Sequence, residues 1–434
     1  MTAPAPAPAT GPAPAPTRGA ATLFAIFAAL AIGGALVLKA APLGPWTAGA
    51  LSFAAVIAGA LLISWGAEAA QVFVGQGLAV AFIALLQVMP EFMVEADIAW
   101  RREVDLMFAN ATGSNRILIG VGWPLIFFTA DVASRLRGTG GVKTIKLRKE
   151  HVIEVFALLV SSAYYLVLLA KGELAPADSA VLGGFFFAYL WLLSRLPPED
   201  EGEELLRPAR FLVEQKPPGR RWWIFGVFAA GALPLILVAD PFVTAMKDIA
   251  VRVSGATTPE AIARAQFVFV QWVAPFLSEF PEKLTAFYWS RTVRMAPMAL
   301  LNMISSTISQ YTALVAMIPL VYSASLGHLA AVPMSPVHHD EIFLSFAMTL
   351  YACATLMKLE FTLGNTLVVL VGWLVQFSFP TTLPFVGGDS HFIVAYAFVA
   401  LTAVELALRW GLIRERLPAA LRHSVALLAR RTVD

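Results

Sequence analysis

Long hydrophobic stretches alternate with short polar segments along most of the chain. A helix needs about 20 mostly apolar residues to cross a bilayer, and the sequence contains twelve such segments. With approximate ends, they are residues 20–37, 45–65, 75–100, 106–130, 151–169, 179–196, 222–239, 263–290, 297–325, 341–357, 361–379 and 391–410. This pattern predicts an all-α polytopic membrane protein with about twelve transmembrane helices.

Composition supports this class and excludes others. Hydrophobic residues make up 58% of the 434 residues and charged residues 14%, against roughly 45 to 50% and about 25% in soluble proteins. A net charge of +2 is too balanced to indicate a nucleic-acid partner. Cys353 is the only cysteine, so an intrachain disulfide or a cysteine-based metal site is excluded.

Basic residues crowd three segments that fall on one side of a twelve-span topology. The positive-inside rule assigns that side to the cytoplasm. We therefore expect an integral protein of the cell membrane with both termini in the cytoplasm. The basic residues are Arg135, Arg137, Lys143, Lys146, Arg148 and Lys149 in one loop, Arg207, Arg210, Lys216, Arg220 and Arg221 in another, and Arg414, Arg416, Arg422, Arg430 and Arg431 in the tail.

Two Pro-Glu pairs lie inside apolar stretches. Pro90 and Glu91 stand in "VMPEFMVEADIAW", and Pro281 and Glu282 in "FLSEFPEKLTAFYWSR". Each is followed by a span rich in small polar residues, "FANATGSNRILIG" in the first copy and "LLNMISSTISQYT" in the second. The two Pro-Glu spans are third and eighth in the order, so they enter the membrane from opposite sides. The sequence thus predicts two inverted five-helix repeats with one flanking helix at each end.

This organisation divides the chain into seven segments. The Pro/Ala tract at the N-terminus has almost nothing to bury, and we expect it to be disordered. The apolar segment after it has the form of a signal peptide or of a first membrane helix, and we favour a retained helix. The expected segments are a tail at 1–19, an extra helix at 20–44, the first repeat at 45–196, a cytoplasmic linker at 197–221, the second repeat at 222–380, an extra helix at 381–412 and a basic cytoplasmic tail at 413–434.

The polar residues of these spans offer oxygen ligands. Carboxylate, amide, hydroxyl and carbonyl oxygens suit hard cations such as sodium and calcium, and a proline frees a helical carbonyl. A carboxylate at the middle of the membrane raises the free energy of insertion by about 2.5 to 3.5 kcal/mol. We therefore expect it only where it pairs with another group or contacts water. Inverted repeats place a substrate site near the midplane. We predict one central cation site that includes Glu91, Asn110, Ser114, Ser278, Glu282, Asn302 and Ser306.

The same motifs resemble a known family. "VMPEFMVEA" with "ANATGSN" is similar to the first alpha-repeat of the cation/calcium exchanger superfamily, and "SEFPEKL" with "NMISST" to a divergent second repeat. "ISWGAEAA" resembles the first core helix of the family, and "AKGELAPADSAVLGGFFFAYLWL" the end of its first half, so the resemblance covers about residues 46–379. It implies a secondary active antiporter for small inorganic cations, calcium, sodium or protons, which works by alternating access without a cofactor or catalytic residue.

The resemblance also implies roles for single residues. Glu91 and Glu282 are implied as central cation ligands, together with Asn115. The partner of Asn115 in the second repeat is normally Asn or Asp, but here it is Thr307 or a neighbour. This departure leaves open which ions are exchanged and in what ratio.

Two basic residues stand beside the expected ligands. Arg116 follows Asn115 directly, and Lys283 follows Glu282. Our hypothesis is that one of these positive charges takes the place of a bound ion and pairs with Glu95 or Glu282. The alternative is that Glu91 and Glu282 are structural ion-pair partners of Arg116 or Lys283. Glu95 fits a ligand role and an interfacial role equally.

Other functions also have to be weighed. A cation channel could use the same oxygens. A membrane metalloenzyme could recruit the cluster "SPVHHDEI", with His338, His339, Asp340 and Glu341, which we expect in an outer surface loop. The sequence offers no nucleophile motif, phosphate loop or zinc spacing that favours an enzyme, and it does not indicate an oligomeric state.

Overall fold

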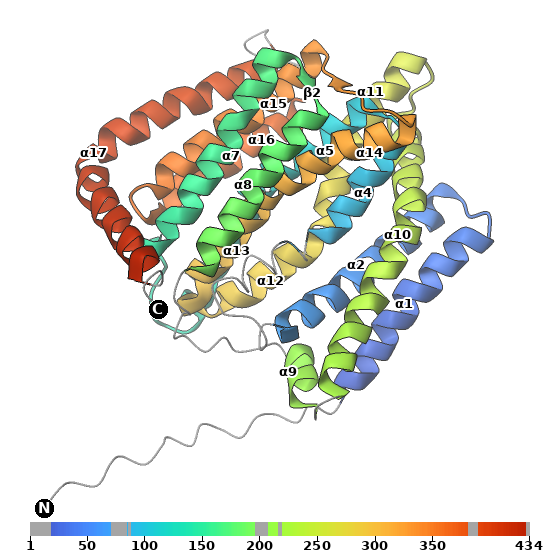
Figure 1. The fold of residues 1–434 in the computed structure, drawn as a ribbon, viewed down its shortest axis with the longest axis horizontal. Helices are drawn as coiled ribbons and strands as arrows, with labels where there is room; N and C mark the ends of the chain where they lie inside the picture. The colour runs from blue at the N-terminus through green and yellow to red at the C-terminus, as the bar shows by residue number, and fades with distance from the viewer. Residues whose placement is uncertain are drawn as a thin grey trace, which may run out of the picture.

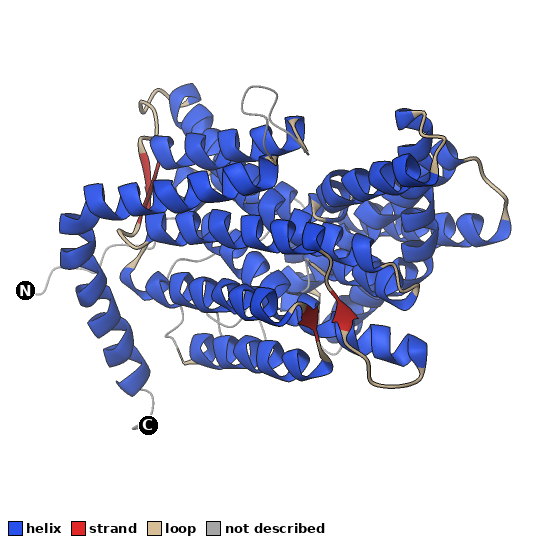
Figure 2. Ribbon diagram, turned by 90° about the horizontal axis from the view of Figure 1, so that it is seen from above, coloured by secondary structure: helices blue, strands red, loops and turns tan. Residues whose placement is uncertain are grey.

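The computed structural model describes residues 19–70, 85, 88–195, 207–215, 219–380 and 389–430. The expected tail up to residue 18, most of the apolar run at 71–87 and parts of the linker lie outside the described residues, as do 381–388 and 431–434. The described chain is almost entirely helical (Figures 1 and 2).

The helices follow the expected order. Those of the first half are α1 (Ala20–Ala40), α2 (Pro45–Ala70), α4 (Met89–Trp100), α5 (Val104–Ile117), α6 (Trp123–Leu136), α7 (Val152–Lys171) and α8 (Pro176–Ser194). Those of the second half are α10 (Gly219–Ser254), α11 (Pro259–Ser278), α12 (Phe280–Arg291), α13 (Ala296–Ser309), α14 (Val315–Leu326), α15 (Pro336–Leu356), α16 (Leu363–Ser378) and α17 (Ser390–Arg430). The short helix α9 (Arg207–Glu214) lies within the segment expected as a linker.

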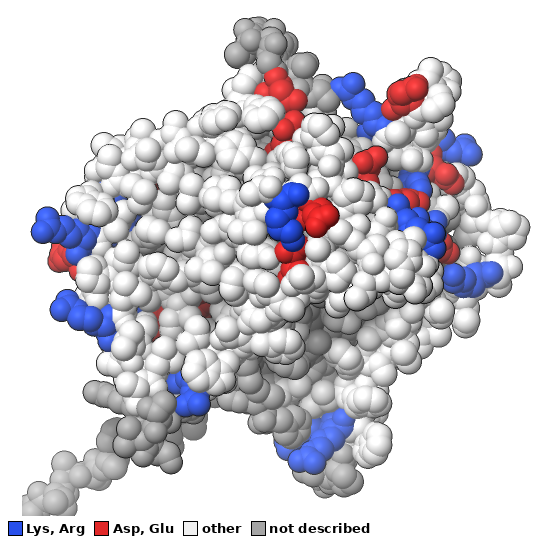
Figure 3. Space-filling view, turned by 45° about the horizontal axis from the view of Figure 1, so that its top comes forward, with Lys and Arg blue, Asp and Glu red and all other residues white. Residues whose placement is uncertain are grey.

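Nine helices in the described part of the chain are long and apolar enough to cross a membrane. The other three expected spans correspond to α4, whose preceding residues are not described, to the shorter α16, and to α15. On the face shown in Figure 3, large uncharged areas separate the charged side chains. The protein is therefore an integral membrane protein of the predicted all-α class.

The two Pro-Glu motifs begin equivalent helices. Pro90 is the second residue of α4 and Pro281 the second residue of α12, and each of these helices has 12 residues. Proline is tolerated in the first turn because its missing N–H would have no partner there. Since α11 ends at Ser278 and α12 begins at Phe280, the eighth span is broken at Glu279, as the proline predicted.

The partner spans share a second irregularity. A π-helical turn at Leu118–Gly122 joins α5 to α6, and another at Gln310–Leu314 joins α13 to α14. Leu118 and Gln310 lie 192 positions apart, as do Asn110 and Asn302. Single π-helical turns inside helices often occur at functional sites, and here the same turn recurs in both halves.

Two small antiparallel sheets tie the halves together. β1 (Thr144–Lys146) pairs with β4 (Glu360–Thr362), and β2 (Glu173–Leu174) pairs with β3 (Val332–Pro333). β1 and β3 follow the equivalent helices α6 and α14, whereas β2 and β4 follow α7 and α15. Exchanging the halves therefore maps one sheet onto the other. Because β1 and β2 lie at opposite ends of α7, this relation confirms the inverted repeats.

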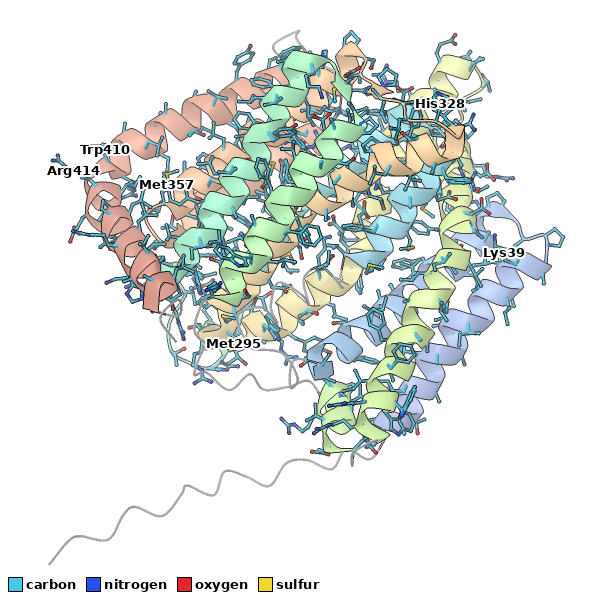
Figure 4. The ribbon with its side chains drawn as sticks, viewed as in Figure 1. Lys39, Met295, His328, Met357, Trp410 and Arg414 are labelled. Carbon is cyan, nitrogen blue, oxygen red and sulfur yellow. The ribbon has the colours of Figure 1, made fainter. Side chains whose placement is uncertain are left out.

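The flanking helices pack on the outside of this arrangement. α1 lies beside α2 and α10, and α17 packs along α15 at the other side of the molecule (Figure 1). α17 bends near Trp410 and Arg414 (Figure 4). Pro418 explains the bend, because a proline ring clashes with the carbonyl four residues earlier. The segment expected as a basic tail thus continues the last helix to Arg430.

α2 and α10 touch through glycines. A Cβ atom added to Gly231 would lie 2.4 Å from the carbonyl oxygen of Gly59, and one added to Gly59 would lie 2.9 Å from that of Gly231. Backbone atoms cannot move aside as a flexible side chain can. These two glycines therefore set the distance between the first helices of the two repeats.

We predict that Gly231→Ala destabilises the protein by about 1 to 3 kcal/mol, the usual range for an overpacked core. The matched control is Gly226→Ala on the same helix, where nothing lies within 4 Å of the added Cβ. Thermal unfolding in detergent checks both variants. Equal melting temperatures for the two variants would contradict the close backbone contact.

Candidate functional site: a cluster of buried carboxylates

The carboxylate of Glu91 lies where the two repeats meet. Glu91 is completely buried in the first turn of α4. Ser114 on α5 donates a hydrogen bond of 2.6 Å to its Oε1 atom, and Asn110 on the same helix donates a second. Ser278, the last residue of α11, donates to its Oε2 atom. A side chain of the second half thus holds the central carboxylate of the first half.

Glu95 lies one turn further along α4. The Asn110 amide nitrogen donates to its Oε2 atom at 2.7 Å and therefore bridges Glu91 and Glu95. The Oε1 atom of Glu95 and the Oδ1 atom of Asn110 are buried and have no hydrogen-bond partner among the described residues. Both of these oxygens are consequently available to a ligand.

Glu282 has the least satisfied carboxylate of the cluster. Its side chain is completely buried, and neither carboxylate oxygen has a hydrogen-bond partner in the described part of the chain. Glu282 is the equivalent of Glu91 in the second repeat, and both carboxylates are buried in the interior.

Lys283 and Glu279 form an ion pair beside Glu282. The Lys283 Nζ atom lies 2.7 Å from the Glu279 Oε2 atom. The Gln310 amide donates to the other carboxylate oxygen of Glu279 at 2.8 Å. The hypothesis that Lys283 pairs with Glu282 or Glu95 is wrong for the described contacts, because its side chain extends back one helical turn to Glu279.

The remaining candidate ligands differ in their surroundings. Asn115 donates to the backbone carbonyl of Ala111, and its Oδ1 atom is buried with no partner among the described residues. The Ser306 hydroxyl is also buried without such a partner, whereas Thr307 donates to its own helix at the Met303 carbonyl. Asn302 is completely buried on the same helix.

Arg116 belongs to a second buried cluster. It forms an ion pair with Glu341 on α15, and it also donates to the Gln376 side chain at 3.2 Å and to the Thr112 carbonyl at 3.1 Å. Its guanidinium group lies 4.9 Å from the centre of the Trp272 ring. The expected pairing of Arg116 with Glu95 or Glu282 is therefore wrong.

The histidine-rich segment also differs from the prediction. α15 begins at Pro336, so His338 and Glu341 lie in its first turns and are buried, not in a surface loop. His338 contacts Asp105 on α5 at 2.8 Å, and His391 lies 3.0 Å from Glu341. Among the described residues, no group of three His, Cys, Asp or Glu side chains could hold a metal ion. His338 and Glu341 instead contact side chains of α5 and α17.

Known proteins share this architecture. The family model of the sodium/calcium exchanger protein matches residues 44–195, which span α2 to α8. The crystal structure of the H+/Ca2+ exchanger CAX is similar with a TM-score of 0.83 and 26% sequence identity, over 95% of this chain and 100% of that chain. Residues 44–195 thus match the sodium/calcium exchanger family, and the chain as a whole is similar to the H+/Ca2+ exchanger CAX.

More distant structures share the fold. The sodium-calcium exchanger NCX_Mj superposes with a TM-score of 0.53 and 16% identity, over 77% of this chain and 97% of that chain. No curated protein matches the chain. Both of these similar structures are named as ion exchangers, which are transporters.

The sequence contains a signal for the pairing of Glu279 with Lys283, but this signal is ambiguous. Glu279 and Lys283 are four residues apart, the spacing at which side chains meet on a helix. The interruption before Pro281 obscured that spacing, since it left open whether the helix continued through Glu279. Gln310 was recognisable only as part of a polar stripe with Asn302 and Ser306.

We predict that Arg116→Met destabilises this exchanger by about 3 to 5 kcal/mol, because it leaves Glu341 buried without its main partner. Lys39→Met is the control, since Lys39 and Asp240 form an ion pair whose side chains are 47% and 46% exposed. Such a pair contributes about 0 to 1 kcal/mol. Unfolding in detergent measures both changes, and an Arg116 variant as stable as the Lys39 variant would disprove the pairing.

Proposed function

We propose that the protein is a secondary active antiporter that exchanges a hard cation such as calcium against protons or sodium at one central site. The observation that carries this proposal is the buried Glu282 carboxylate, whose two oxygens have no hydrogen-bond partner among the described residues. An ionised carboxylate that is buried alone is strongly unfavourable. A bound cation or proton removes that cost, so the site favours occupation.

Glu91 and Glu282 are the principal ligands in this proposal. Asn110, Ser114 and Ser278 hold Glu91 from two sides and supply further oxygens. Buried oxygens of Glu95, Asn115 and Ser306 also have no hydrogen-bond partner among the described residues, so they are further candidate ligands. Asn302 and Thr307 complete the expected set. Carboxylate, amide and hydroxyl oxygens are the ligands that calcium and sodium prefer.

The repeat architecture supports alternating access. Ser278 stands at the break between α11 and α12 and contacts Glu91 of the other half. A rocking motion of one half against the other would therefore change the coordination of the site and its exposure together. The similarity to a protein described as an H+/Ca2+ exchanger supports protons as one of the exchanged ions.

The two kinds of ion compete for the same carboxylates, and this competition couples their fluxes. Several uncompensated carboxylates are costly to move through a low-dielectric interior. The empty, ionised site therefore resists the change of access, whereas a cation or protons neutralise it and permit the change. Each direction of movement then carries one kind of ion. We further infer that both termini face the cytoplasm, with the two repeats at 45–196 and 222–380.

We predict that Glu91→Gln and Glu282→Gln each reduce cation-driven exchange in proteoliposomes by at least about a hundredfold, since each removes a ligand charge in a desolvated site. Flux is followed under imposed calcium, sodium and pH gradients. Glu260→Gln is the matched control, because Glu260 is exposed in the first turn of α11.

The wild type and the Glu260 variant should exchange one ion only when a counter-ion is present on the opposite side. Calcium flux that needs no counter-ion would identify a channel and contradict antiport. Full activity of the Glu282 variant would remove Glu282 from the site.

A further inference from the structure

The second half of the site contains a polar triad that the first half lacks. Its members are Glu279, Lys283 and Gln310, all of which are buried. Lys283 lies 2.7 Å from one oxygen of Glu279, and Gln310 donates to the other oxygen at 2.8 Å. Glu279 is thus fully partnered, in contrast to the neighbouring Glu282.

The internal repeat identifies what stands in the place of each member. The alignment that relates Glu282 to Glu91 relates Glu279 to Val88 and Lys283 to Phe92. The alignment that relates Asn302 to Asn110 relates Gln310 to Leu118. Three apolar side chains of the first half therefore correspond to three polar side chains of the second, in which Glu279 contacts both of the others.

A requirement for packing alone does not explain this triad. Val88 and Leu118 are buried, so apolar residues fill the equivalent space in the first half. Replacing a buried ion pair by apolar residues is often neutral or stabilising. The triad therefore points to a role in the charge of the site.

Lys283 brings a positive charge into the carboxylate cluster. Lys283 directly follows Glu282 in the sequence, and its ammonium group forms an ion pair with Glu279. Its ammonium group lies 5.7 Å from the centre of the Phe276 ring, on the side of α11. The side chain thus places one positive charge beside Glu279, as a bound monovalent cation would, but the charge is covalently attached to the protein.

We propose that Lys283 is a tethered cation that occupies the position of one monovalent ion beside Glu279, so that this exchanger carries one positive charge fewer per cycle than the same site without the lysine. The inference rests on the proposed function, because it concerns ions bound at the central site. Gln310 positions Glu279 and leaves Glu282 to the transported ion.

The test measures the charge moved per exchanged calcium ion. Full-length Lys283→Gln is reconstituted in proteoliposomes, and the membrane potential at which net calcium flux stops is determined with and without sodium. We expect a change of one elementary charge per cycle and a new dependence on sodium. Sodium should also raise the melting temperature of this variant but not of the wild type, because a ligand of the native state stabilises it.

Three further variants separate charge from structure. Glu279→Gln leaves the ammonium group without its partner, so it should turn to Glu282 and weaken calcium binding by roughly tenfold or more. The double variant Glu279→Gln with Lys283→Gln removes the carboxylate that the extra cation needs, so it should restore the wild-type charge per cycle. Lys171→Gln is the control, since Lys171 pairs with Asp178 at 2.6 Å outside the site.

Suppose that the wild type exchanges calcium, but Lys283→Gln moves the same charge per cycle and is not stabilised by sodium. This result would overturn the inference about Lys283 and leave antiport intact. Unchanged calcium affinity in Glu279→Gln would also overturn it, even where Lys283→Gln fails to fold. If the wild type itself shows no exchange, the proposed function fails instead.

Discussion

A carboxylate that is buried without a partner is strongly unfavourable. The interior between α4, α11 and α12 buries four carboxylates, those of Glu91, Glu95, Glu279 and Glu282. Local structure offsets this cost unequally. Glu91 receives hydrogen bonds from both halves, Glu279 is held by Lys283 and Gln310, and Glu95 is half-satisfied. Glu282 is left for a ligand. The broken span follows from the same need, because it brings Ser278 to Glu91.

A second buried cluster differs from the carboxylate cluster because its charges are fully paired. Arg116 and Glu341 are paired directly, and the surrounding Thr112 and Gln376 groups satisfy the guanidinium. Arg116 and Ser114 lie on the same helix but face different clusters. Gly113, between these residues and Asn110, lets α5 approach α11, since a Cβ atom there would lie 2.0 Å from the Gln271 carbonyl oxygen. A fixed ion pair therefore anchors the helix that presents Asn110 and Ser114 to Glu91.

Much of this organisation could be predicted because it depends on local patterns. Hydrophobic length indicated the spans, and the duplicated Pro-Glu motif indicated the inverted repeat and the broken helix. The sequence also included Glu91 and Ser278 in one expected site, but it did not predict their hydrogen bond. The partners of the two basic residues were missed. Adjacent residues on a helix point about 100° apart, so Lys283 cannot share the direction of Glu282. Glu341 lies 225 positions from Arg116, and only the packing of α15 against α5 brings them together.

The central claim is that Glu91 and Glu282 share one dehydrated cation. Anomalous diffraction from crystals grown with calcium tests this most directly. The account predicts one peak within about 2.3 to 2.6 Å of oxygens from both carboxylates, the range of calcium–oxygen distances. Anomalous density confined to the surface, or an interior that stays empty at saturating calcium while the two carboxyl groups face away from each other, would contradict it.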